Sequence, residues 1–164
     1  GGGGKEKVEE RLPGGRRRVR YRNGTVKEVE ADGSALVRFA NGDTKHTDAS
    51  SGAVRYYYAK AETAHVTYTN GLQIFEFPNE QVEKHYPDGK KEISFPDGTV
   101  KVIRTDGVQE SVFADGVIVV EYPEGYSEIT TPDGSTHREY ADGRVEHLLP
   151  ASSSSSQKKQ WSFF

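Results

Sequence analysis

The stretch FPDGTVKVIRTDGVQESVFADGVIVVEYPEG, residues 95–125, decides the fold because it places a turn at every ninth residue. An acidic residue followed by glycine recurs at Gly98, Gly107, Gly116 and Gly125. Nine residues are too few for a helical repeat with its own turn, but they suffice for one short strand and one tight turn. Val, Ile, Thr, Tyr and Phe, which strands prefer, fill the intervals. The stretch therefore predicts successive β-hairpins.

The same spacing continues through most of the chain. Glu62 and Glu80 occupy the glycine position of two intervals, and one extra residue lies near Ser50. We count about fifteen intervals after Gly15, and residues 7–12, KVEERL, fit one more. The glycines that carry the repeat are Gly15, Gly24, Gly33, Gly42, Gly52, Gly71, Gly89, Gly98, Gly107, Gly116, Gly125, Gly134 and Gly143.

The sequence Pro-Asp-Gly, at 87–89, 96–98 and 132–134, indicates the type of turn. Pro, Asp and Gly in this order suit a three-residue loop made of a type I turn and a left-handed third residue. A two-residue type I′ loop is the alternative, but Pro would then remove an N–H from the strand ladder. We therefore expect positive φ at the third loop residue.

The three-residue loop also predicts which residues share a face of the sheet. It pairs Phe77 with Gln81 and Phe75 with Glu83, and it places Arg138 between Glu128 and Glu146. Aromatic residues stand before many turns, and cross-strand packing is their ordinary role. With the three-residue loop, these aromatic residues alternate between the two faces of the sheet. The aromatic residues before turns are Tyr21, Phe39, Tyr58, Tyr68, Phe77, Tyr86, Phe95, Phe113, Tyr122 and Tyr140.

We predict an all-β fold: a single-layer, extended antiparallel β-meander of about fifteen short strands with nine-residue repeats. Both faces are expected to be largely solvent-exposed, because Lys, Glu, Arg and Thr separate the aromatic rows and leave neither face apolar enough to close a sandwich core. Strands are expected at 16–21, 25–30, 34–39, 72–77, 81–86, 90–95, 99–104, 108–113, 117–122 and 135–140.

Length and composition suit one such domain of the 164 residues. We expect a linker-like segment at 1–6, the meander at 7–149 and a Ser-rich flexible tail at 150–164. There is no Cys, no Gly-rich phosphate loop and no His at metal-motif spacing. Net charge is −3 with both signs mixed, so nucleic acid is not an expected partner. A membrane is not expected either, because no apolar run is long enough for a transmembrane helix.

A catalytic role is not expected, and neither is a cofactor or a metal. A single-layer sheet lacks the deep pocket in which acid pairs could be desolvated. The histidine pairs His65 with His85 and His137 with His147 fall on shared faces, but packing is the more economical interpretation. An enzyme remains only a formal alternative.

The densest aromatic region spans RYYYAK at 55–60 and QIFEFPNEQVEKHYP at 73–87. Phe75, Phe77 and Glu83 are expected on one face with His65, and Phe39 and Tyr56 or Tyr58 join them if the extra residue near Ser50 preserves the alternation. Rings spaced across strands suit stacking on proline, and a carboxylate beside them suits Arg or Lys. A groove for a proline-rich basic peptide and a merely well-packed central segment both remain open at this point.

The same residues carry a resemblance to a known family. YYYA, TYTNGLQIFEFPNEQVEKHYPDGKKEISFPDGTVK and the nine-residue spacing resemble the G-box, the C-terminal TCP domain of CPAP-type centriole scaffolds. The resemblance covers roughly residues 7–149. It implies a free-standing antiparallel sheet that binds a proline-rich segment of a STIL-type protein during centriole duplication.

By motif, the resemblance implies that Phe39, Tyr56, Phe77 and Glu83 contact the partner, and the parity of the strands adds Tyr58 and Phe75. It further implies a location in the cytoplasm and cytoskeleton, at the centrosome and centriole. The alternative function is a structural domain that assembles edge to edge in a centriole or an axoneme, because open sheet edges can pair with other chains.

Overall fold

The computed structural model describes residues 6–148, which form sixteen strands in one open antiparallel sheet whose spatial order follows the sequence. Among these residues the only helical segment is the 3-10 turn Pro13–Gly15, so none of them belongs to a helix able to cross a membrane. The expected tail at 150–164 lies outside the described residues. Two compact units, residues 1–87 and 88–164, divide the chain.

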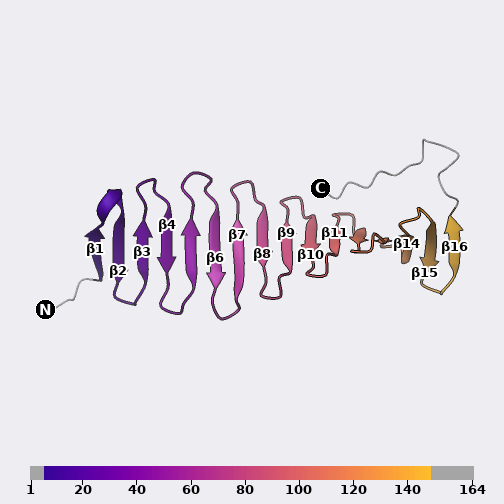
Figure 1. The fold of residues 1–164 in the computed structure, drawn as a ribbon, viewed down its shortest axis with the longest axis horizontal. Coiled ribbons are helices and arrows are strands. Elements are labelled where there is room, and N and C mark those ends of the chain that lie inside the picture. The colour runs from indigo at the N-terminus through magenta and orange to yellow at the C-terminus, as the bar shows by residue number, and fades with distance from the viewer. Residues whose placement is uncertain (1–5, 149–164) are drawn as a thin grey trace. The chain divides into compact units, whose positions relative to one another are not determined.

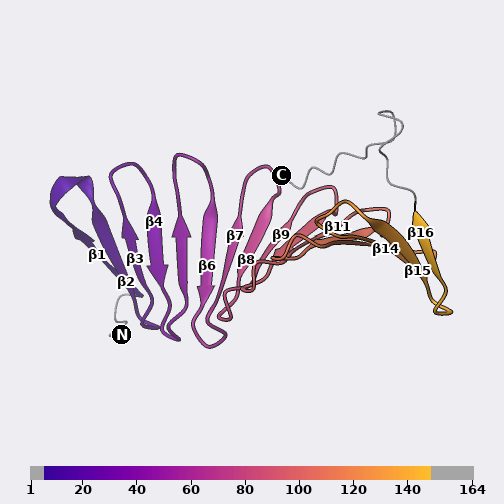
Figure 2. The ribbon, with the colours of Figure 1, turned by 45° about the vertical axis from the view of Figure 1, so that its right-hand side comes forward.

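The first unit is a row of nine strands in one layer, joined by loops at alternate ends (Figures 1 and 2). Each strand pairs antiparallel with the next along the chain. The strands are β1 (Lys7–Arg11), β2 (Arg17–Tyr21), β3 (Val26–Val29), β4 (Ala35–Arg38), β5 (Thr44–Thr47), β6 (Val54–Tyr58), β7 (Thr63–Thr67), β8 (Gln73–Glu76) and β9 (Val82–His85).

The second unit repeats this plan with seven strands, again paired antiparallel in chain order. Its strands are β10 (Lys91–Ser94), β11 (Val100–Ile103), β12 (Gln109–Val112), β13 (Ile118–Glu121), β14 (Tyr126–Thr130), β15 (Thr136–Tyr140) and β16 (Val145–Leu148). All ten ranges predicted from the sequence contain a strand, and KVEERL supplies β1.

The turns have the predicted three-residue geometry. Gly89, Gly98 and Gly134 have φ of 98°, 91° and 89°. At the loop between β8 and β9, the Phe77 N–H donates to the Gln81 carbonyl at 2.9 Å, and the Glu80 N–H donates to the Phe77 carbonyl at 3.0 Å. Glu80 therefore replaces glycine in the same turn and adopts a φ of 71°.

Two loops are one residue longer and absorb the irregular spacing. Residues 49–52 and 59–62 connect pairs that remain in register, Thr47 with Val54 and Tyr58 with Thr63. The alternation of faces is therefore preserved past the extra residue. In the first of these loops, Asp48 accepts hydrogen bonds from the hydroxyl groups of Ser50 and Ser51 and closes the longer turn.

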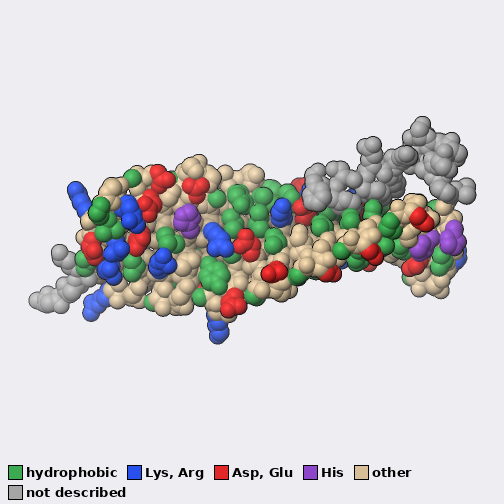
Figure 3. Space-filling view, in the orientation of Figure 1, with side chains coloured by type: hydrophobic (Ala, Val, Ile, Leu, Met, Phe, Trp, Pro, Cys, Tyr) green, Lys and Arg blue, Asp and Glu red, His purple; other side chains and the backbone are tan. Residues whose placement is uncertain are grey.

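The sheet has little apolar core. The buried hydrophobic residues are small, and among residues 6–148 no large side chain is completely buried. Charged and apolar side chains are intermixed on the surface shown in Figure 3. Arg138 lies between Glu128 and Glu146 as predicted, and its guanidinium donates to Glu128 at 2.7 Å. The buried hydrophobic residues are Val19, Ala64, Val102, Val108 and Val120.

The left-handed backbone at Glu80 generates a first prediction. Left-handed φ strains a residue with a Cβ, whereas glycine adopts it freely. Glu80→Gly should raise the free energy of unfolding by about 0.5–1 kcal/mol, because the strain relieved exceeds the added entropy of the unfolded chain. Chemical denaturation measures the change.

The matched control for this prediction is Glu124→Gly, the same substitution in a turn where the replaced residue does not have positive φ. Glu124→Gly should lower the free energy of unfolding, because glycine raises the conformational entropy of the unfolded chain and no backbone strain is relieved. Stabilisation by both substitutions, or by neither, would contradict the assignment of strain to Glu80.

Turn carboxylates generate a second prediction, on pH. Hydrogen bonds from the Ser51 hydroxyl, the Thr99 N–H and the Thr131 hydroxyl, respectively, lower the pKa values of Asp48, Asp97 and Asp133. A carboxyl whose pKa is lower in the folded state than in the unfolded state stabilises the fold above the unfolded pKa, about 3.9 for Asp. This stabilisation is lost as the pH falls through the folded-state pKa. The denaturation midpoint should thus decline below about pH 4. A midpoint unchanged between pH 6 and pH 3 would refute this.

Candidate functional site

The six residues predicted from the sequence lie on one face of the first unit. Direct cross-strand partners share a face, and the register joins Tyr56 to His65, His65 to Phe75 and Phe75 to Glu83. Side chains two residues apart on a strand also share a face. We call this surface the aromatic face and define it by Phe39, Tyr56, Tyr58, Phe75, Phe77 and Glu83.

The rings on this face form two groups, each with stacked and tilted contacts. In the first, the centroid of Tyr56 lies 5.7 Å from that of Phe39 and 4.4 Å from that of Tyr58. In the second, Phe75 stacks on His65 at 4.3 Å with an interplanar angle of 9°. The Phe77 and His85 rings lie 6.4 Å and 4.8 Å from Phe75. Each ring is thus supported from the side while its outer surface faces solvent.

Asp43 holds the first group of rings. Its carboxylate accepts a hydrogen bond from the Tyr56 hydroxyl at 3.1 Å and another from the Ala59 N–H at 2.9 Å. The bond from Ala59 is the main cause that lowers the pKa of Asp43. Burial, together with the bond to Asp43, raises the pKa of Tyr56 above its ordinary value of 10.0. The tyrosine therefore stays neutral and fixed in orientation.

Glu83 is the carboxylate beside the second group. Its Oε1 accepts a hydrogen bond from the Gln81 amide at 3.2 Å, and its Oε2 lies 3.2 Å from His85 Nε2. Its side chain is 24% exposed. The side chains two residues before and after Glu83 thus orient the carboxylate, while it keeps access to solvent and to a cationic partner.

Sequence reasoning identified this face but missed part of it. The signal that could have found Asp43 is the register, which brings the start of β5 beside Tyr58. The register also separates the three consecutive tyrosines: Tyr57 pairs with Ala64 and lies on the opposite face. Of the histidines, His65 was expected here, whereas the contact of His85 with Phe75 was not.

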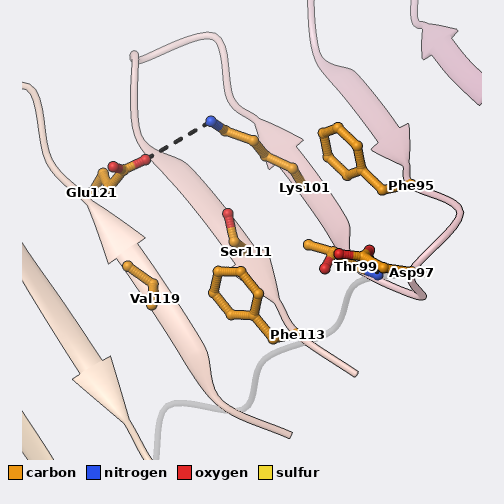
Figure 4. A pocket seen from close by; sticks show the side chains of 8 residues that line it. All are labelled: Phe95, Asp97, Thr99, Lys101, Ser111, Phe113, Val119 and Glu121. Atoms are coloured by element: carbon orange, nitrogen blue, oxygen red, sulfur yellow. Dashed lines mark hydrogen bonds and ion pairs between the residues drawn. The ribbon is translucent and has the colours of Figure 1, made fainter. Parts of the chain in front are cut away.

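The second unit has a hollow that none of these residues lines. It has a volume of about 350 Å³, and its lining includes the rings of Phe95 and Phe113 and a Lys101–Glu121 ion pair of 3.9 Å (Figure 4). Each of its two rings precedes a turn, as on the aromatic face, but here the ion pair occupies the one cation of the lining, and Asp97 adds a second carboxylate. Within residues 6–148, no group of three or more His, Cys, Asp or Glu side chains could hold a metal ion.

An open sheet with supported, solvent-facing rings and one oriented carboxylate defines a protein-interaction domain built from β-hairpin repeats. Residues 13–45 and 69–103 match the family described as T-complex protein 10 C-terminus. Centrosomal P4.1-associated protein of Mus musculus is 45% identical over 79 residues, 48% of this chain and 6% of the relative. The chain thus spans only a small part of the curated relatives it matches.

Solved structures extend the similarity over most of the chain. The TCP10 domain of Danio rerio CPAP, in complex with a peptide of Danio rerio STIL, is 47% identical; the match covers 88% of this chain and 84% of that one, with a TM-score of 0.62. The SAS-4 TCP domain of Drosophila melanogaster, in complex with a proline-rich motif of Ana2, is 33% identical. That match covers 87% of this chain and 89% of the other, with a TM-score of 0.73. The chain therefore belongs to the TCP domain family of CPAP and SAS-4 proteins.

The contact between Asp43 and Tyr56 generates a third prediction. Asp43→Asn removes the charge that disfavours the phenolate and should lower the pKa of Tyr56 toward 10. Titration of the tyrosine ring signals by NMR measures this change. The signals of Tyr57, on the opposite face, serve as the internal control. A Tyr56 pKa that is unchanged or higher would contradict the role assigned to Asp43.

Proposed function

We propose that the chain is a non-catalytic interaction domain of a centriole-assembly protein, and that its aromatic face binds a proline-rich segment of a STIL-type partner. The observation that carries the proposal is the convergence of Tyr56, Phe75, Phe77 and Glu83 on one face of the first unit. The family relationship supports it, because two relatives were solved with STIL or Ana2 peptides.

The chemistry of the face suits such a ligand. Proline rings stack on aromatic side chains, and a polyproline II segment is already extended, so that binding orders little additional chain. The rings of Phe75 and Phe77, 6.4 Å apart, offer two neighbouring stacking surfaces. The Glu83 carboxylate, directly opposite Phe75 and 3.2 Å from His85, offers a charge contact to an Arg or Lys of the peptide.

The relatives also support a location at the centrosome, where the domain would join two proteins of the assembling centriole. Edge-to-edge assembly through β1 or β16 is the second candidate, because the sheet is open and these strands form its edges. The charged side chains of β1, KVEER, weigh against it by discouraging strand addition. Oligomerisation that increases with protein concentration would favour it.

A fourth prediction tests the proposed site. Phe77→Ala should weaken binding of the Ana2 proline-rich motif by at least about 1 kcal/mol, because aromatic anchors dominate peptide interfaces. Glu83→Gln should weaken it less, and its effect should shrink as salt is added. Isothermal titration calorimetry measures both, and melting curves establish that the variants are folded.

Two controls match these substitutions. Phe113→Ala removes a ring that also precedes a turn but lies in the second unit, and Glu76→Gln alters a carboxylate on the opposite face of β8. Neither should change the affinity. Unchanged affinity in both Phe77→Ala and Glu83→Gln, or loss of folding in both, would refute the proposed site.

A further inference from the structure

We infer that the aromatic face continues into a cationic subsite, formed by Lys27 and Lys45, that binds acidic residues of the same peptide. The inference rests on the proposed function and adds a charge order to its ligand. The peptide should carry its basic residue at one end of the proline segment and acidic residues at the other.

A single row of cross-strand partners carries the inference. From β2 to β9 the register joins Val19, Lys27, Val37, Lys45, Tyr56, His65, Phe75 and Glu83, each directly opposite the next. The row therefore runs from the two lysines of β3 and β5, through the rings, to a carboxylate. Past Val19 the row reaches Glu9 of β1, which already pairs with Lys7 at 3.6 Å. A peptide that crosses the strands over the rings therefore meets lysines on one side of the rings and the Glu83 carboxylate on the other.

Neither lysine has an ion-pair partner among residues 6–148. Their direct neighbours in the row are Val19, Val37 and Tyr56. Asp43, the acidic residue nearest to Lys45 on this face, already accepts hydrogen bonds from Tyr56 and Ala59. The opposite face differs, because Arg18 pairs there with Glu28 and Arg55 with Glu76. Lys45 is exposed and Lys27 half-buried, so both ammonium groups remain available to a ligand.

The spacing of the strands sets the spacing of charges in the ligand. Neighbouring strands lie about 4.8 Å apart, so Lys45 on β5 is about 19 Å and Lys27 on β3 about 29 Å from Glu83 on β9. A polyproline II segment advances about 3.1 Å per residue. Acidic residues should thus lie about six to nine residues from the basic residue.

Synthetic peptides test this order of charges. One is Arg-Pro-Pro-Ala-Pro-Pro-Ala-Asp-Glu-Asp, and a second has the reversed sequence, because either direction could fit the face. The neutral twin of each carries Ser-Gly-Ser in place of the acidic residues. At low salt, one acidic peptide should bind about fourfold or more tightly than its twin, since each exposed charge pair contributes about two- to fivefold. The gain should shrink as salt is added.

The variant Lys27→Gln/Lys45→Gln should abolish the gain and leave the affinity of the neutral twin unchanged. Arg38→Gln, a cation on the opposite face of β4, is the matched control and should keep the gain. Equal affinity of the acidic and neutral peptides for the unaltered chain, or a gain retained in the double variant, would overturn the subsite alone. Failure of both neutral twins to bind would overturn this inference, whereas failure of the Ana2 motif in its own titration would overturn the proposed function.

Discussion

The rest of the structure depends on the tight turn that returns the chain after each short strand. Two backbone hydrogen bonds join the residue before the loop to the loop's last residue and to the residue after it, as at Phe77, Glu80 and Gln81. The left-handed third residue makes this closure possible, which explains why glycine recurs at that position. Because the turn fixes the register, it also decides which side chains share a face.

Packing within each face then takes the place of a deep core. Among residues 6–148 the buried apolar side chains are few and small, so the larger rings pack against rings one or two strands away. On the aromatic face these contacts join Phe39 to Tyr56 and Phe75 to His65. Such contacts stabilise the sheet and at the same time leave one side of each ring in solvent. The same rings can therefore support the sheet and bind a partner.

The sequence was sufficient to predict most of the fold, because the nine-residue spacing and the Pro-Asp-Gly turns determine the register without any long-range information. The aromatic face followed from the same alternation, since Phe75 and Glu83 are paired by one turn. The hydrogen bond from Tyr56 to Asp43 could not be predicted in this way, because it depends on side-chain rotamers and on the four-residue loop at 49–52. The order of charges along the row became visible only when eight successive strands were aligned.

The central claim is that a proline-rich peptide lies on the aromatic face and not on its reverse. The most direct measurement is of intermolecular nuclear Overhauser effects between an unlabelled Ana2 proline-rich motif and the isotope-labelled chain. Our account predicts contacts from proline protons to the rings of Tyr56, Phe75 and Phe77. Contacts to Tyr57 and Ile74, on the opposite face, without contacts to these three rings would contradict it.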